Sequence, residues 1–280
     1  MKRVGVVGCG AMGSGIVQVS AQAGYQVTVR DINDEFLNRG LGMIKSSLQR
    51  DVDRSRMTAE DRDAIWGRIK GTTKLEDLAD SDLIVEAAIE EIGEKRSIFG
   101  TLDRVCPPST ILSTNTSSLT VIEMAAATKR PQQVLGLHFF NPAQVMKLVE
   151  IVRTIVTSDE AVEVGRKYEE SIGKTPVLAK DQPGFIVNRL LVPYLLDAIR
   201  VYQDGLASAQ DIDQGMLLGC NHPMGPLALS DLIGLDVLLH VAESLHAELA
   251  EPRFAAPPLL KRMVMAGHLG RKTKRGFYAY

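Results

Sequence analysis

Short apolar runs separated by longer amphipathic segments make up the first part of the chain. Runs of strand length cover residues 3–7, 26–30, 82–87 and 110–114, and the first of them is followed by a stretch with helical spacing. Strands that alternate with helices are typical of a parallel sheet covered on both faces. The pattern therefore predicts an α/β fold whose first domain is a Rossmann-type, doubly wound sheet.

Two further strands are expected at residues 134–140 and 146–152. Because proline lacks a backbone donor and disfavours helix in the residue before it, the first of these strands ends before Pro142. A tight turn there would bring Glu150 back beside His138. A carboxylate bonded to one ring nitrogen fixes the tautomer, so that the other nitrogen can exchange a proton near neutral pH. The pair is either an acid/base dyad, or a core histidine bonded to a backbone carbonyl with the carboxylate on a solvated face.

The pattern changes near residue 182. A helix at 158–171 and a last strand at 175–178 precede a segment whose proline and glycine, Pro183-Gly184, indicate a break. We predict a domain boundary there, with residues 1–182 forming the cofactor-binding domain and residues 183–280 an all-α substrate and dimerisation domain. The helices expected in the second domain are 185–205, kinked at Pro193, 208–218, 226–249 and 258–267.

Composition narrows the class of protein. The chain has 280 residues, 45% of them hydrophobic, and a net charge of -2 with acidic and basic residues interspersed. We therefore expect no nucleic-acid partner, no membrane partner and no membrane span. The three cysteines match no metal or redox spacing and indicate a reducing compartment. Because no signal pattern is present at the N-terminus, we expect a cytoplasmic protein. We expect no bound metal, because the remaining histidines, His222, His240, His246 and His268, lack a partner at metal-ligand spacing.

A glycine-rich turn lies between the first strand and the first helix. It consists of Gly8, Cys9, Gly10, Ala11, Met12 and Gly13. Gly8 permits the tight turn, Gly10 lets the backbone approach a pyrophosphate, and Gly13 lets the helix pack close to the strand. Asp31 follows the second strand, where an acid binds the adenosine ribose. We expect NAD, with NADP as the alternative because Arg30 could accommodate a 2′-phosphate. A glycine turn without a ligand is the remaining interpretation.

Polar residues follow the strand at 110–114. Ligands of open parallel sheets lie beyond the carboxyl ends of the strands, so Ser117 and Ser118 are candidate ligand contacts. Either serine could instead cap the helix expected near Leu119. Asn188, at the start of the second domain, could point its amide into the cleft between domains or bond locally at the start of its helix.

Two helices with several basic residues are expected at 33–54 and 58–68. Their basic residues, which include Lys45, Arg50 and Arg54, could meet phosphates or cover a solvated face.

The second domain carries long apolar stripes, such as residues 227–239. A stripe of this length would stay exposed if the helical segment stood alone. We therefore predict a homodimer built through residues 183–280.

Several short motifs together resemble one family of enzymes. They are Gly-Cys-Gly-Ala-Met-Gly at 8–13, Asn-Thr-Ser-Ser-Leu at 115–119, Gly-Leu-His-Phe-Phe-Asn-Pro at 136–142, Met-Lys-Leu-Val-Glu at 146–150, Pro-Gly-Phe-Ile-Val-Asn-Arg at 183–189, Asn-His-Pro-Met-Gly-Pro at 221–226 and Gly-Phe-Tyr at 276–278. On these motifs the chain resembles, from end to end, the L-3-hydroxyacyl-CoA dehydrogenase family, and most of all its bacterial 3-hydroxybutyryl-CoA dehydrogenases.

The resemblance implies reversible hydride transfer between NAD(H) and C3 of an acyl-CoA thioester, namely (S)-3-hydroxybutanoyl-CoA and acetoacetyl-CoA, in short-chain fatty acid (butanoate) metabolism. It implies that His138 is the catalytic acid/base, that Glu150 orients it, and that Ser117 and Asn188 position the 3-oxygen. The cofactor contacts that the resemblance implies are Asp31, Glu90, Lys95, Asn115 and Lys272, and the coenzyme A contacts are Ser47 and Arg54. Many relatives have glycine where this chain has Lys274.

Two other functions stay open. The same histidine and glutamate could oxidise another hydroxy acid or a sugar acid, as some relatives on this architecture do. Turnover of free acids but not of thioesters would indicate that function. The chain could also be a non-catalytic cofactor-binding protein, because a fold alone does not fix a function.

Overall fold

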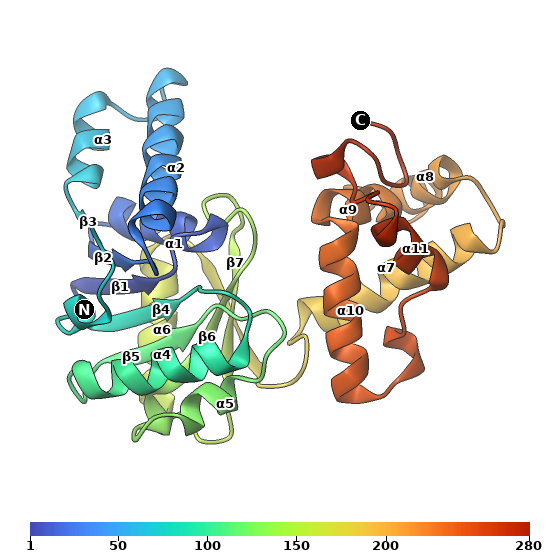
Figure 1. Ribbon diagram of the computed structural model, residues 1–280. Helices are drawn as coiled ribbons and strands as arrows, with labels where there is room; N and C mark the ends of the chain where they lie inside the picture. The colour runs from blue at the N-terminus through green and yellow to red at the C-terminus, as the bar shows by residue number, and fades with distance from the viewer. The chain divides into compact units, whose positions relative to one another are not determined.

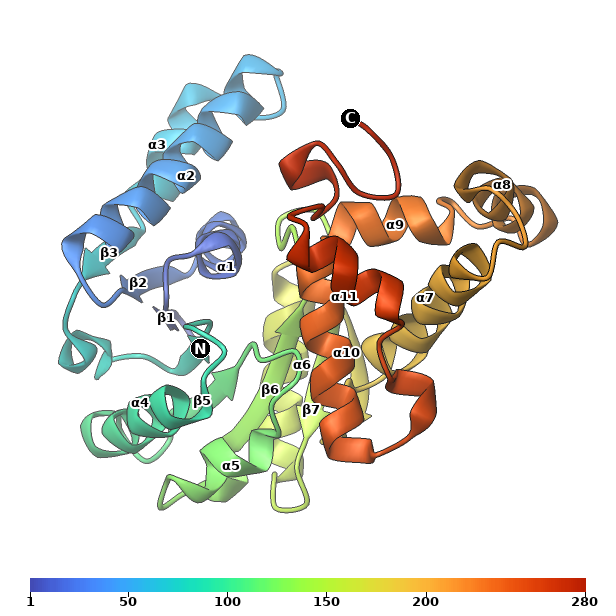
Figure 2. The same ribbon diagram turned by 45° about the vertical axis from the view of Figure 1, so that its right-hand side comes forward.

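The computed structural model describes residues 1–280. The chain divides into two compact units, Met1–Gln182 and Pro183–Tyr280, each with its own hydrophobic core. Figures 1 and 2 show a sheet covered by helices in the first unit and helices without a sheet in the second. The predicted α/β Rossmann-type fold followed by an all-α part is confirmed. The functional roles assigned to the two parts of the chain stay predictions.

One eight-stranded sheet organises the first unit, in the order β3-β2-β1-β4-β5-β6-β7-β8. The strands are β1 (Arg3–Val7), β2 (Gln26–Arg30), β3 (Ile69–Thr72), β4 (Leu83–Glu86), β5 (Ile111–Thr114), β6 (Val134–Phe139), β7 (Leu148–Arg153) and β8 (Thr175–Lys180). All neighbours are parallel except β6 and β7, which are antiparallel. Because helices cover both faces, the central strands β4 and β5 are buried along their whole length.

The edge strand β3 is not predicted by the sequence. Its four residues read Ile-Lys-Gly-Thr, and only Ile69 is strongly apolar. The strand forms because its backbone pairs with β2. Such pairing depends on a partner remote in sequence, and a hydrophobic pattern does not reveal it.

The first unit contains six helices. They are α1 (Ala11–Gln22), α2 (Asp34–Asp53), α3 (Ala59–Trp66), α4 (Ile92–Val105), α5 (Val121–Ala126) and α6 (Asp159–Ser171), with short 3-10 turns η1 (Leu75–Leu78) and η2 (Pro131–Gln133). Ser20 of α1 bonds to Tyr168 of α6 at 2.6 Å, and Tyr25, in the turn after α1, bonds to Ser171 of α6 at 2.6 Å. Figure 1 shows α4 and α5 in front of the sheet and α6 behind it.

Helices α2 and α3 form an arm that extends beyond the β3 edge, as both ribbon views show. Each helix begins at a side-chain cap, Asn33 for α2 and Thr58 for α3. The root of α2 packs tightly on the glycine turn, because a Cβ added to Gly40 would lie 2.0 Å from the carbonyl oxygen of Cys9. The arm is therefore anchored on the turn predicted to bind the cofactor.

The second unit consists of helices around a separate core. They are α7 (Val187–Gln203), α8 (Ala209–Gly219), α9 (Pro226–Ile233), α10 (Leu235–Leu249) and α11 (Pro258–Met265), with 3-10 turns η3 (Pro252–Phe254) and η4 (Arg271–Thr273). The single helix predicted at 226–249 is wrong, because Gly234 adopts φ +102° and separates α9 from α10. Pro193 lies inside α7, which continues past it.

No helix of either unit combines the length and hydropathy that a membrane span requires.

Candidate active site

His138 and Glu150 lie opposite each other on the antiparallel strands β6 and β7. The ring Nδ1 of His138 is 2.7 Å from Oε2 of Glu150, and the two residues are 5% and 0% exposed. The predicted contact is therefore confirmed. The predicted tight turn is wrong, because residues 140–147 form a longer loop in which the amides of Val145 and Met146 donate to the carbonyl of Pro142. A buried, carboxylate-bonded imidazole has the arrangement of an acid/base pair.

The position of His138 in the sheet is that of a ligand-facing residue. His138 is the next-to-last residue of β6, which runs parallel to β5. The carboxyl ends of parallel strands share one edge of the sheet, so His138 lies at the same edge as the turns that follow β1, β4 and β5. The ring of Phe140 lies against the imidazole, with centroids 4.6 Å apart.

The glycine turn has the geometry of a dinucleotide cradle. Gly8 adopts φ +97°, and a Cβ on Gly13 would lie 1.9 Å from the carbonyl oxygen of Gly8. A Cβ on Gly10 would meet nothing within 4 Å, so the surface above it is open. No side chain caps α1, whose first residues are Ala11 and Met12, and its first amides are therefore available to an anion. The residues present fit a pyrophosphate.

Asp31 lines a hollow of about 480 Å³ together with Gly8, Gly10, Arg30 and residues of the turn after β4. One carboxylate oxygen of Asp31 accepts from the amide of Cys9 at 2.7 Å, and the other accepts from its neighbour Ile32 at 2.7 Å. Arg30 donates through Nε to the carbonyl oxygen of Thr73. Burial, reinforced by the negative charge of Asp31, raises the pKa of the Cys9 thiol to about 12, so this cysteine stays neutral in the turn.

A buried ionic network underlies the edge of the sheet. Lys95, which is 1% exposed, pairs with Glu86 at 2.7 Å and with Glu90 at 3.3 Å. Glu86 ends β4 and also accepts from Thr114 and from the amide of Ala88. The sequence pattern did not single out Glu86. Because a carboxylate at the end of a buried strand needs a cationic partner, the sequence could have predicted an ion pair at Glu86.

Glu90 organises the loop that contains Ser117. Its Oε1 accepts from the Thr116 hydroxyl and from the amides of Ser117 and Ser118. Burial alone would raise the pKa of Glu90, but the Lys95 ammonium and these hydrogen bonds hold it below its ordinary value. The structure thus joins two predicted cofactor contacts, Glu90 and Lys95, to the predicted substrate contact Ser117. Thr116, which the sequence analysis missed, completes the network.

The serines do not cap the next helix, contrary to the alternative considered for them. Helix α5 begins at Val121, and its first amides donate to the carboxylate of Asp181 at 2.9 and 2.8 Å. Asn115, a predicted cofactor contact, accepts through Oδ1 from the amide of Phe139 at 2.9 Å. Its side chain therefore ties the loop after β5 to the strand that carries His138.

The remaining predicted contacts lie elsewhere in the chain. Asn188 is on α7 and Lys272 on η4, both in the second unit, and Lys272 pairs with Asp236 at 2.5 Å. The turn after Thr273 has Lys274 at φ +57°, a conformation that favours glycine. Ser47 on α2 and Arg54 at its C-cap lie on the arm. The roles of these residues stay predictions.

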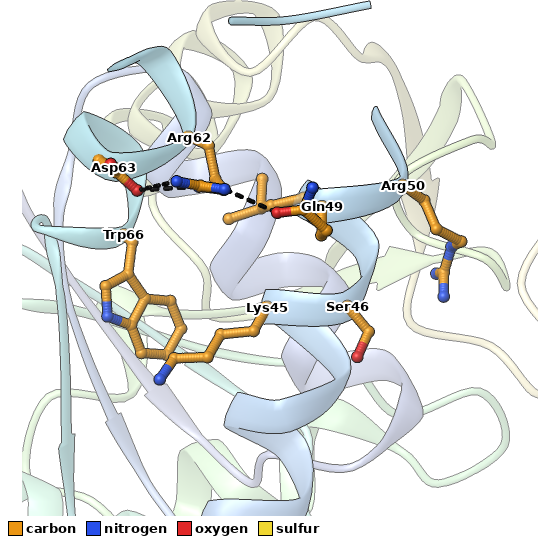
Figure 3. A pocket seen from close by; sticks show the side chains of 8 residues that line it. Lys45, Ser46, Gln49, Arg50, Arg62, Asp63 and Trp66 are labelled. Carbon is orange, nitrogen blue, oxygen red and sulfur yellow. Dashed lines mark hydrogen bonds and ion pairs between the residues drawn. The ribbon is translucent and has the colours of Figure 1, made fainter. Parts of the chain in front are cut away.

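The arm carries a basic hollow of about 620 Å³. Lys45, Ser46, Gln49 and Arg50 of α2 line it together with Arg62, Asp63 and Trp66 of α3. Figure 3 shows Lys45 reaching toward Trp66 and Gln49 toward Arg62. The Lys45 ammonium lies 4.5 Å from the centroid of the Trp66 ring, and Arg62 bonds to Gln49 at 2.6 Å. Cationic groups beside an indole suit a ligand that carries both phosphate and an aromatic base.

Comparisons with known proteins agree with these features. A family model of the 3-hydroxyacyl-CoA dehydrogenase NAD binding domain matches residues 3–182, and one of the 3-hydroxyacyl-CoA dehydrogenase C-terminal domain matches residues 184–280. A 3-hydroxybutyryl-CoA dehydrogenase of Mycobacterium tuberculosis is 49% identical and covers 100% of this chain and 99% of the relative. One of Clostridioides difficile is 44% identical over 99% of both chains. The crystal structure of (S)-3-hydroxybutyryl-CoA dehydrogenase PaaH1 from Ralstonia eutropha has a TM-score of 0.96 and 43% identity, and it covers 100% of this chain and 99% of that one.

Proposed function

The chain belongs to the 3-hydroxyacyl-CoA dehydrogenase family, and we propose that it interconverts (S)-3-hydroxybutanoyl-CoA and acetoacetyl-CoA with NAD(H) as cofactor. Family membership makes it an NAD-dependent oxidoreductase of 3-hydroxyacyl-CoA thioesters. The four-carbon substrate is proposed from the names of its relatives. The observation that carries the mechanism is the buried His138–Glu150 pair at the ligand edge of the sheet.

His138 acts as the acid and the base. When NADH is bound, it supplies a hydride to C3 of the 3-oxo thioester. The electron pair of the C3 carbonyl moves onto its oxygen, and His138 donates the Nε2 proton to that oxygen. In the oxidation direction the neutral imidazole takes the hydroxyl proton. Glu150 accepts from Nδ1, which presents Nε2 to the substrate and stabilises the imidazolium.

Ser117 and Asn188 are the proposed partners of the reacting oxygen. Ser117 is suited to this role because Glu90 holds its loop through three neighbouring residues. A donor aimed at an oxygen where charge develops typically contributes about 2.7–4 kcal/mol to the transition state. The amide of Asn188 is the second donor that the family resemblance supplies.

The basic arm is the proposed site for the nucleotide of coenzyme A. The hollow beside Trp66 contains three cationic side chains, Lys45, Arg50 and Arg62. The contacts expected from the sequence are Ser47, on α2, and Arg54, its C-cap residue, and neither lines this hollow. We expect Lys45→Glu, at the Trp66 ring, to raise the KM for acetoacetyl-CoA and to leave the KM for a pantetheine thioester unchanged, because only the full coenzyme carries the nucleotide.

The second unit is the proposed dimer interface. It exposes large apolar side chains, including Leu190 at 66%, Leu206 at 77% and Leu218 at 82%. Exposed apolar area of this kind is stabilised when a second copy covers it. Light scattering at micromolar concentration should give the mass of a dimer, and a monomeric mass would contradict the proposal.

Three free cysteines fit a reducing compartment, so we place the protein in the cytoplasm.

The decisive test follows NADH absorbance with acetoacetyl-CoA, in parallel with NADPH and with the His138→Gln variant. The proposal expects fast NADH oxidation, slower NADPH oxidation and a collapse of both rates in the variant. No turnover with either cofactor, despite tight NADH binding, would favour a free hydroxy acid as substrate. Undiminished turnover in His138→Gln would remove His138 from the chemistry.

A further inference from the structure

Lys174 is a buried cation outside the proposed site. Its residue is 8% exposed and stands immediately before β8. The ammonium donates to the carbonyl oxygens of Ala143 and Met146, the second at 2.8 Å. Burial of an ammonium is costly unless partners replace its water, so these two carbonyls determine where the cation rests.

Glu169 is the titratable neighbour of Lys174. It is 0% exposed, and neither carboxylate oxygen has a hydrogen-bond partner. Helix α6 ends in a Schellman motif, in which the amide of Lys174 donates to the carbonyl of Glu169 and Gly173 adopts φ +74°. Burial raises the pKa of Glu169 and the Lys174 ammonium opposes that shift. Burial lowers the pKa of Lys174, and Glu169 opposes that shift in turn. The two groups thus influence each other electrostatically.

The loop that Lys174 holds, residues 140–147, connects the strand of His138 to the strand of Glu150. At its start, the ring of Phe140 lies against the imidazole of His138, with centroids 4.6 Å apart. A displacement of the loop therefore changes the packing around the imidazole.

The middle of the same loop lies on α1, the helix whose first turn is the proposed pyrophosphate site. A Cβ added to Gly15 would lie 2.9 Å from Cβ of Ala143, so the loop and the helix are in close contact. The side chain of Gln144 also bonds to Gln18 at 3.4 Å. The loop therefore touches both the acid/base residue and the cofactor helix.

We propose that Lys174 is a positioning residue of the reaction: by holding residues 140–147 it fixes the Phe140–His138 contact and the seating of the loop on α1. It thereby aligns the acid/base with the bound cofactor. This inference rests on the proposed function. Misplacement by about 1 Å can cost about a hundredfold in rate, which sets the scale of the expected effect.

The test compares Lys174→Met, Lys174→Arg and, as the matched control, Lys167→Met, a lysine of α6 whose side chain is 71% exposed. Each variant is assayed well below its Tm. In Lys174→Met we expect kcat with acetoacetyl-CoA to fall by about ten- to a hundredfold, while the Kd for NADH stays within about twofold. Lys174→Arg, which keeps the charge, should recover most of the loss, and Lys167→Met should match the wild type.

A wild-type kcat in Lys174→Met would overturn the proposal, because a purely structural role predicts lower stability and unchanged turnover. If that variant does not fold, Lys174→Met/Glu169→Met replaces both buried polar side chains by an apolar pair, an exchange that folded proteins often tolerate. Low kcat with intact NADH binding in the double variant supports the proposal, and wild-type kcat contradicts it.

A second readout separates this proposal from the proposed function. The 1H–15N signals of the His138 imidazole need no substrate, and the adjacent Phe140 ring makes them sensitive to the loop. They should shift in Lys174→Met and stay in place in Lys167→Met. Unshifted signals would refute the positioning role, whereas absence of wild-type turnover on acetoacetyl-CoA would refute the proposed function alone.

Discussion

Replacement of Glu150 by glutamine tests how much of the catalysis depends on a charge beside the imidazole. Glutamine has nearly the same shape, and its amide oxygen can still accept from Nδ1 of His138. What disappears is the negative charge, 2.7 Å from the ring in a pair that is almost fully buried. The substitution therefore isolates the electrostatic role of Glu150 from its orienting role.

The magnitude follows from the distance and the burial. A unit charge about 4 Å from the centre of the imidazolium contributes about 4 kcal/mol at an effective dielectric of about 20. The hydrogen bond to a neutral amide retains about 0.5–1.5 kcal/mol of the interaction. We expect the barrier to rise by about 2–4 kcal/mol, which lowers kcat by roughly 30- to 900-fold.

The assay is steady-state NADH oxidation with saturating acetoacetyl-CoA, together with NADH binding measured by fluorescence. Glu150→Gln should lower kcat and leave the Kd for NADH within about twofold, because the carboxylate acts on the imidazole. Glu163→Gln is the matched control, since Glu163 is exposed on α6 and pairs only with Arg166 and Lys167 of the same helix. Full turnover in Glu150→Gln, or an equal loss in Glu163→Gln, would refute the reasoning.

Three further substitutions give sharp expectations. Asp31→Ser should raise the NADPH:NADH ratio of kcat/KM by about tenfold or more, because charges about 4 Å apart repel by about 1–4 kcal/mol and Arg30 lines the same hollow; an unchanged ratio would contradict this. Burial raises the folded-state pKa of Glu169, so ionisation destabilises the fold as pH rises through that value and has no effect below the unfolded pKa. Glu169→Gln should therefore raise Tm at about pH 9 and leave it unchanged at about pH 4; the opposite trend would show the sign to be wrong. Gly40→Ala should lower the free energy of unfolding by about 1–3 kcal/mol in urea titrations, since its Cβ would meet Cys9; wild-type stability would mean that α2 can move.

Much of the site could be predicted because its determinants are local or periodic. The glycine turn could be recognised because it lies between a strand, β1, and a helix, α1. The contact of His138 with Glu150 follows from the two-residue period of the strands, which fixes the faces once a hairpin is assumed. The predicted length of the connecting loop was wrong, because a proline marks the end of one strand but does not determine where the next strand begins.

The missed features depend on contacts between remote residues. Asp181 caps α5 from 60 residues away, so the nearby serines looked like the caps. Lys95 can pair with Glu86 only because α4 lies over the end of β4, and a short sequence pattern does not predict this packing. Gly234 separates α9 from α10 because its φ is positive, although the apolar spacing alone predicts one helix. In each case the tertiary structure overrides the local preference.

The most direct test of the central claim uses NADH deuterated stereospecifically at C4, with acetoacetyl-CoA as substrate. The account predicts a single deuterium at C3 of the 3-hydroxybutanoyl-CoA product from one C4 epimer only, at a rate that collapses in His138→Gln with unchanged NADH binding. Product without deuterium from either epimer, or undiminished transfer in His138→Gln, would contradict hydride transfer assisted by this histidine.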